Sequence, residues 1–202
     1  MLTGIVFSYL LGQHVGWSRI VEQQMEPALA KMSPEQRAAA EQRIPVQVKF
    51  APVAGYAFAT IGPILTGLIA AGVLTLIVGG ILSAGVKFKQ VLAIYFYSAM
   101  PSILWTVLAI IVMFLKPPGD FVLRNPLAFN LGAFLDPLTS SKFLYSVATA
   151  LDLFTFWRII LIAIGLRVAA SKKLSMGGAL FSVILPWAIL VLIGAAAAGV
   201  FG

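Results

Sequence analysis

Long apolar runs dominate the chain, and short polar segments separate them. Four runs, at about 51–85, 90–115, 143–168 and 179–199, each have the roughly 18 or more mostly apolar residues that cross the hydrocarbon core of a membrane. A shorter run, residues 1–17, precedes them. The pattern predicts an all-α polytopic membrane protein, a bundle of about five transmembrane helices.

The one strongly polar stretch, residues 18–49, has a helix-start signal inside it. Ser-Pro-Glu-Gln at 33–36 places a serine at the N-cap, a proline at the first helical position and a glutamine three residues after the cap. We expect a polar extramembrane helical segment that is interrupted near Pro27 and stopped by Pro45. A solvated loop is the simpler interpretation of its surface, and a docking surface is the alternative.

Composition supports the membrane assignment and narrows the function classes. Of 202 residues, 60% are hydrophobic and 10% are charged, whereas soluble domains carry about 25% charged residues. The net charge of +7 comes from scattered basic residues, so we expect no nucleic-acid partner. The absence of cysteine excludes disulfides and cysteine-based metal or iron–sulfur sites.

The loops differ in charge, and this difference predicts the orientation. The turns at 86–89 and 167–173 hold basic residues and no acidic residue, namely Lys87, Lys89, Arg167, Lys172 and Lys173. Because short basic loops stay in the cytoplasm, we expect both turns there. Residues 18–49 and 116–142 then lie outside. The second of these loops is rich in proline, phenylalanine and leucine, which favours an interfacial cap.

The chain therefore divides into a first helix (1–17), a polar segment (18–49) and a membrane bundle (50–202). The first run is short for a span. We expect either a short span anchored by Trp17 or, as we favour, a truncated helix whose native N-terminus lies upstream.

Small or kinking residues recur at every fourth position of the second run: Ala51, Gly55, Ala59, Pro63, Gly67, Ala71, Thr75, Gly79 and Ser83. Residues four apart share one side of a helix, so they form a slim groove that another helix can approach closely. We expect Gly67, Ala71, Thr75, Gly79 and Ser83 to pack against a helix, and a kink at Pro63. A lipid or substrate lying in the groove is the alternative.

Asp152 and Arg158 place two charges inside the fourth long run. A charge at the bilayer centre costs about 2.5–3.5 kcal/mol, so each needs a partner, a wet cavity or a function. Counted from Phe143 along one helix, Asp152 lies about 15 Å in, and Arg158 lies about 24 Å in, close enough to the inner face to snorkel.

We expect other helices to satisfy Asp152, and the candidate donors are Tyr97, Thr75, Ser98 or backbone groups freed near Pro101 and Pro63. The alternative is a proton- or cation-coupled site.

Few other residues offer chemistry. The sequence has no HExxH, no G-x-S-x-G and no phosphate-cradling loop, so we expect no enzyme activity, no metal and no cofactor. The sole histidine, His14, is a weak candidate ligand for haem or a chlorophyll-type pigment.

Two stretches, KFKQVLAIYFYSAMP (87–101) and LDLFTFWRIILIAIGL (151–166), resemble bacterial members of the Ypt-interacting protein (Yip) domain family. The resemblance covers about residues 50–201 and rests on Gln90, Tyr97, Pro101, Asn130, Asp152, Phe154, Trp157 and Gly165. It implies a five-helix membrane bundle in the bacterial cytoplasmic (inner) membrane.

In eukaryotic relatives, the resemblance implies roles in membrane traffic through small Rab-type GTPases and partner membrane proteins. Much of that binding uses a cytoplasmic N-terminal segment that we do not find here, so we do not carry a GTPase role over.

Two functional hypotheses remain. The favoured one is an integral membrane scaffold or accessory subunit that binds the lipid bilayer and a membrane-protein partner or further copies of itself. The alternative is a small lipid or solute transporter with a site around Asp152 and Tyr97. The candidate functional residues are Asp152, Arg158, Tyr97, Pro101, Trp157 and Gln90.

Overall fold

The computed structural model describes residues 2–30, 32–136, 139–170 and 173–201. The described helices are α1 (Leu2–His14), α2 (Trp17–Leu29), α3 (Pro34–Glu41), α4 (Ile44–Thr75), the π-helical η1 (Leu76–Ile81), α5 (Phe88–Tyr97), α6 (Met100–Leu115), the 3₁₀ turn η2 (Leu131–Phe134), α7 (Lys142–Ala150), α8 (Leu153–Ala169) and α9 (Met176–Phe201). An isolated antiparallel bridge is the only β-type pairing among these residues. The all-α prediction is confirmed.

Among the described residues, three helical stretches are long and apolar enough to cross a membrane, at Ile44–Ile81, Phe88–Leu115 and Met176–Val200. They overlap the predicted runs and confirm a multi-pass membrane protein. The helices α1 and α8 have 13 and 17 residues, and the shortest membrane spans have about 17. The predicted count of five spans is therefore approximate.

The predicted helix at 143–168 is wrong in one respect, because the chain leaves helical geometry at Leu151 and Asp152 and forms α7 and α8. The third run is likewise divided, between α5 and α6. Pro101 is the second residue of α6. The amides of the first turn make no hydrogen bond inside the helix, so the missing amide hydrogen of a proline costs nothing there. A proline that we expected to disturb a span thus starts one.

The helix-start signal in the polar segment is confirmed. The Ser33 hydroxyl accepts a hydrogen bond from the Gln36 amide (3.4 Å), and the Gln36 side chain accepts one from the Ser33 amide (3.2 Å). The interruption expected near Pro27 is wrong, because α2 continues to Leu29. Pro45 does not stop α3, which ends four residues earlier, and instead lies in the first turn of α4, a position that suits proline.

The kink expected at Pro63 does not interrupt the helix, since α4 is continuous through Pro52 and Pro63. Membrane helices tolerate internal proline because local side chains satisfy backbone groups. Pro63 removes the donor of the Ala59 carbonyl. The nearby Thr60 hydroxyl donates to other carbonyl oxygens of the same helix, those of Tyr56 (2.9 Å) and Ala57 (3.1 Å).

The helix ends in the π-helical η1, a geometry that the sequence pattern did not predict. Ser83 follows it in a turn with a φ of 49°.

The described residues form two compact units, Met1–Pro63 with Thr106–Leu127 and Ile64–Trp105 with Ala128–Phe201. These limits differ from the segments expected from sequence because α4 and α6 each contribute residues to both units. Each unit has its own apolar core.

The core of the first unit is built around Trp17. Its indole lies between two glycines, since a Cβ at Gly12 would collide with Nε1 and one at Gly55 would lie 2.7 Å from Cη2. The buried residues of this core are Leu11, Val15, Ile20, Met113 and Phe121. Trp17 therefore packs against backbone where larger residues would exclude it.

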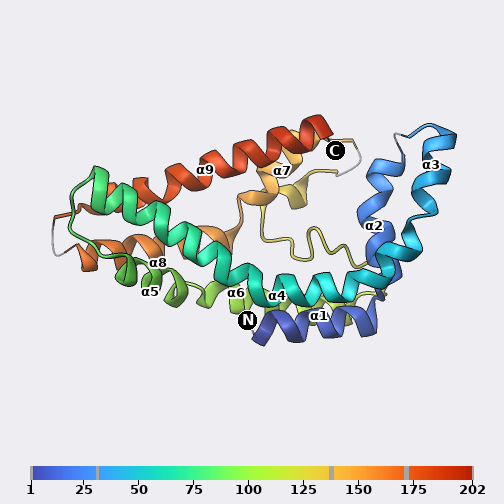
Figure 1. The fold of residues 1–202 in the computed structure, drawn as a ribbon, viewed down its shortest axis with the longest axis horizontal. Helices are drawn as coiled ribbons and strands as arrows, with labels where there is room; N and C mark the ends of the chain where they lie inside the picture. Colours follow the sequence, from blue (N-terminus) through green and yellow to red (C-terminus); the bar gives the residue numbers. More distant parts are fainter. Residues whose placement is uncertain (1, 31, 137–138, 171–172, 202) are drawn as a thin grey trace. The chain divides into compact units, whose positions relative to one another are not determined.

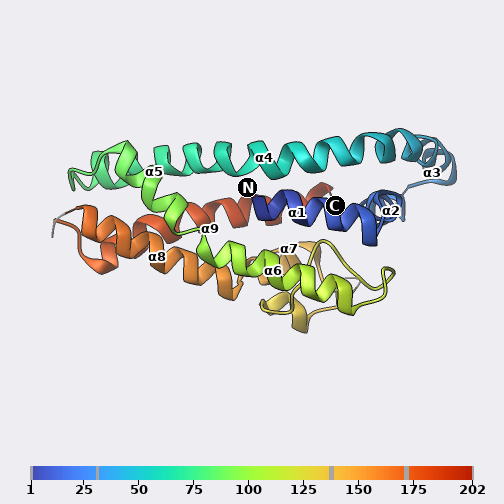
Figure 2. The same cartoon turned by 90° about the horizontal axis from the view of Figure 1, so that it is seen from below.

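The second unit is centred on α8, which packs against α9. Figures 1 and 2 show these two helices from two directions. The rings of Phe156 and Trp187 meet edge to face at 5.8 Å across this pair. On its other side α8 contacts α5 closely, because a Cβ on Gly165 would lie 2.5 Å from Cγ2 and 3.3 Å from Cβ of Ile94. The buried residues of α8 in this core are Ile159, Ile162, Ala163 and Leu166.

Replacing Gly165 with alanine should lower the free energy of unfolding by about 1–3 kcal/mol, because the new methyl would clash with Cγ2 of Ile94 at 2.5 Å and press tightly, at 3.3 Å, on its Cβ, which is fixed to the backbone of α5. Gly72→Ala is the matched control, since nothing lies within 4 Å of its Cβ position. Gly72→Ala should be neutral or stabilise by about 0.5–1 kcal/mol. Thermal unfolding in detergent checks both variants, and equal melting temperatures would contradict the close contact of α5 with α8.

Candidate functional site at the break between α7 and α8

Asp152 lies at the break and caps the N-terminus of α8. Its Oδ1 accepts hydrogen bonds from the backbone amides of Phe154 (2.9 Å) and Thr155 (3.0 Å), and the residue is only 9% exposed. A helix start has four amides with no acceptor inside the helix, and aspartate is among the best residues for that position. The negative carboxylate also interacts favourably with the positive end of the helix dipole.

The same residue ties a distant loop to α8. Asn130 and Asp152 form an isolated antiparallel bridge. The Leu153 amide donates to the Phe129 carbonyl (3.0 Å) and the Leu131 amide donates to the Leu151 carbonyl (3.3 Å). These bonds satisfy backbone groups that the helix break would otherwise leave unpaired in apolar surroundings.

Side chains tighten the junction of this loop with α7 and α8. The rings of Phe129 and Phe154 meet edge to face at 5.7 Å. Gly132 lies against Thr149, where a Cβ would collide with the Thr149 methyl and lie 3.2 Å from its backbone nitrogen. The loop residues before η2 therefore fit closely over the point where α7 ends and α8 begins.

Arg158 lies one and a half turns further along α8 and stacks on an aromatic ring. Its Cζ lies 4.3 Å from the centroid of the Tyr95 ring on α5, a cation–π geometry. Its Nε is buried and has no hydrogen-bond partner in the part of the chain that the structure describes.

The other predicted functional residues do not gather at Asp152. Tyr97 is 83% exposed and Trp157 is 44% exposed, whereas Pro101 is fully buried. Gln90 is exposed, and its side chain accepts a hydrogen bond from the Lys87 amide (2.9 Å) at the start of α5. The donors bound to Oδ1 of Asp152 are amides of its own helix rather than the hydroxyls expected from sequence.

Within the second unit, the small-residue positions lie against neighbouring groups of the same chain. A Cβ on Gly67 would lie 2.6 Å from the Phe96 ring, and one on Gly79 would lie 3.2 Å from the Val86 carbonyl oxygen. Ala71 is buried, and its carbonyl accepts a bond from the Thr75 hydroxyl (2.6 Å). Ser83 is exposed and lies beyond the helix, so it is not a packing position.

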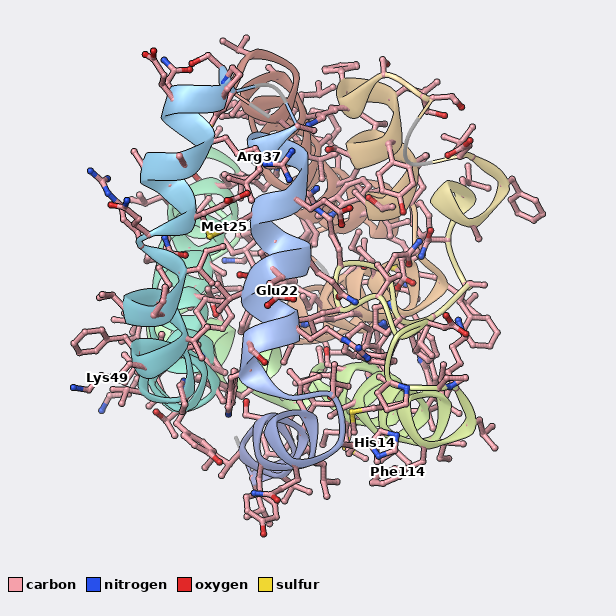
Figure 3. All side chains as sticks on the ribbon, turned by 90° about the vertical axis from the view of Figure 1, so that its right-hand side faces the viewer. His14, Glu22, Met25, Arg37, Lys49 and Phe114 are labelled. Carbon is pink, nitrogen blue, oxygen red and sulfur yellow. The ribbon has the colours of Figure 1, made fainter. Side chains whose placement is uncertain are left out.

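His14 lies at the end of α1, and its side chain and that of Phe114 point toward one another (Figure 3). The two ring centroids are 4.6 Å apart with the planes tilted by 42°. The Nε2 atom is buried and has no hydrogen-bond partner among the described residues. Those residues also contain no cluster of three or more histidine, cysteine or carboxylate groups able to hold a metal ion.

Sequence reasoning missed two residues of this region. The Tyr95 ring contacts Arg158. Tyr95 lies two residues before Tyr97 in an aromatic-rich run, and nothing in the sequence distinguishes the two tyrosines. Gly132 fits under Thr149, and only a three-dimensional contact reveals that requirement. Lys172, expected in the second basic turn, lies outside the described residues.

Comparison with known proteins agrees with the resemblance seen in the sequence. A family model described as the Yip1 domain matches residues 1–198, which includes α1, α2 and α3 as well as the later helices. No curated protein and no solved structure matches the chain.

Two substitutions at Asp152 test whether its side-chain oxygen caps α8. Asp152→Asn keeps an oxygen acceptor and should change the free energy of unfolding little, whereas Asp152→Ala leaves buried amides unpaired and should lower it by about 1–3 kcal/mol. Thermal unfolding of the purified variants in detergent measures both. Asparagine and alanine variants of equal stability would show that Oδ1 is not needed to cap α8.

Proposed function

Because the chain belongs to the Yip1 domain family, we propose that it is an integral membrane scaffold or accessory subunit that binds a membrane-protein partner and catalyses no reaction. Its three long apolar helices place it in contact with the lipid bilayer. The proposal includes two further claims: that a membrane-protein partner exists, and that the membrane is the bacterial cytoplasmic membrane.

The observation that carries this proposal is the hydrogen bonding of Asp152. In the transporter hypothesis, Asp152 is the intramembrane carboxylate that exchanges protons or cations during the cycle. Here that carboxylate accepts two backbone amides of α8 and lies under the loop that its backbone bridges. Releasing it would uncap the helix, which favours a structural role. The transporter hypothesis is further weakened by Tyr97, whose side chain is 83% exposed rather than directed at a buried site.

The small-residue positions of α4 offer little surface to a partner. Gly67 lies against Phe96 in one unit, and Gly55 lies against Trp17 in the other. Ala59 likewise contacts Gly4, since a Cβ on Gly4 would lie 3.5 Å from the Ala59 methyl. The chain itself therefore occupies much of the groove that we expected a partner helix to use, and partner binding falls to other surfaces.

The polar helix α3 is the best of these surfaces. It has no buried residue, yet its start is fixed by the Ser33 capping box and its exposed face carries the Arg37–Glu41 ion pair (2.8 Å). α2 lies beside the α3–α4 segment, with Met25 directed between them (Figures 1 and 3). A capped and exposed helix without a core of its own fits a docking element better than a solvated loop.

The charge pattern orients the protein in this proposal. The basic turns at 86–89 and 167–173 lie in the cytoplasm in this proposal, and positive-inside weighting then leaves the polar segment 18–49, which contains α3, on the outside. The partner therefore carries an extracytoplasmic surface.

Photo-crosslinking in the native membrane tests the proposal. A benzophenone side chain at Ala39, an exposed position of α3, should form one adduct of defined mass with a second membrane protein. The matched control is Ile69 on α4, which is 67% exposed on an apolar helix and should give lipid adducts. An absence of protein adducts at Ala39, with normal lipid adducts at Ile69, would contradict the scaffold function.

A further inference from the structure

Arg158 lies on the apolar helix α8 and has no carboxylate partner among the residues that the structure describes. Its Nε is buried and unpaired, its ring contact is with Tyr95, and none of the carboxylates in the described part of the chain forms an ion pair with it. Asp152, the acid nearest in sequence, is engaged in capping α8. A cation in apolar surroundings is costly unless a counter-charge is supplied, so the balancing charge comes from outside this chain.

The depth of the Arg158 guanidinium favours a carboxylate on a neighbouring helix over a lipid phosphate as the source of that charge. Tyr95 lies seven residues after Phe88, the start of α5, and so about 10.5 Å below the basic turn that contains Lys87. In the proposed orientation, this turn lies at the level of the lipid headgroups. The guanidinium is held over Tyr95, at that depth. A lipid phosphate would have to be drawn about 10 Å into the hydrocarbon, whereas a carboxylate on a neighbouring helix already lies there.

A second copy of this chain does not supply the charge. Asp152 is the one acid in its apolar runs, and it is buried and bound to its own helix. The remaining acids lie in polar segments and loops. The missing carboxylate therefore belongs to a different protein.

We infer that Arg158 is a docking residue for an aspartate or glutamate within a membrane-spanning helix of a partner protein, with Tyr95 holding the guanidinium in position. Arg158 is partly exposed, so a helix outside this chain can reach its terminal nitrogens. A carboxylate accepts two parallel N–H bonds from a guanidinium, and such pairs between membrane helices are strong and specific. This inference rests on the proposed scaffold function and names the chemistry of its intramembrane contact.

Native mass spectrometry of the protein extracted gently from its own membrane tests the inference. Arg158→Met keeps the apolar stem and removes the charge, and should reduce the retained partner by at least about tenfold. Arg158→Lys keeps a charge without the planar fork and should retain part of it. The matched control is Arg167→Met, an exposed cation in the last turn of the same helix, which should retain the partner fully.

The partner's own sequence completes the test. It should contain an acid within an apolar run, and exchanging the charges (Arg158→Asp with that acid changed to arginine) should restore the complex. If Arg158→Met lowers the folded yield, Arg158→Gln provides a second neutral variant.

Three outcomes would overturn the inference. The Arg158→Met variant could retain the partner, it could lose a bound anionic lipid or a second copy in place of a partner, or the wild-type chain could carry no partner at all.

The crosslinked adduct at Ala39 distinguishes the two proposals. If this adduct forms equally well with Arg158→Met, the scaffold function stands and only the role of Arg158 fails. If no adduct forms at all, both fail.

Discussion

A helix that begins in apolar surroundings must find acceptors for its first amide hydrogens, and here Asp152 provides them. Unpaired backbone groups in a membrane cost several kcal/mol each, so a break in a long apolar run is stable only where the loose ends are satisfied. The Asp152 carboxylate satisfies two amides of α8, and the bridge to Asn130 satisfies the backbone on either side of it. This one residue allows α7 and α8 to be separate helices.

The position of α8 then fixes the contacts of its whole unit. The helix starts at Leu153, and this start determines which side chains face its neighbours. Phe156 contacts Trp187 on α9, Arg158 contacts Tyr95 on α5, and Gly165 packs against Ile94 on α5. A shift of one residue in the start would rotate every one of these side chains by about 100°. By setting the register of α8, the cap determines both the packing of the helix and the position of Arg158 over Tyr95.

Local signals in the sequence predicted local structure well. The all-α membrane class followed from the apolar runs, and the Ser33 helix start followed from four consecutive residues. The break at Asp152 was not predictable in the same way. No glycine or proline lies near this acceptor in its apolar run, and the loop that completes the site lies about twenty residues earlier. The prolines misled for the opposite reason. Pro63 continues a helix and Pro101 begins one, since each position tolerates a missing amide hydrogen.

Hydrogen exchange measured by mass spectrometry on the protein in lipid nanodiscs tests the central claim, that Asp152 caps α8. The amides of Phe154 and Thr155 should exchange slowly in the wild-type protein and in Asp152→Asn. They should exchange much faster in Asp152→Ala, while the peptide around Gly165 keeps its protection. Unchanged exchange at Phe154 and Thr155 in Asp152→Ala would show that the carboxylate does not hold the start of the helix and would contradict the account.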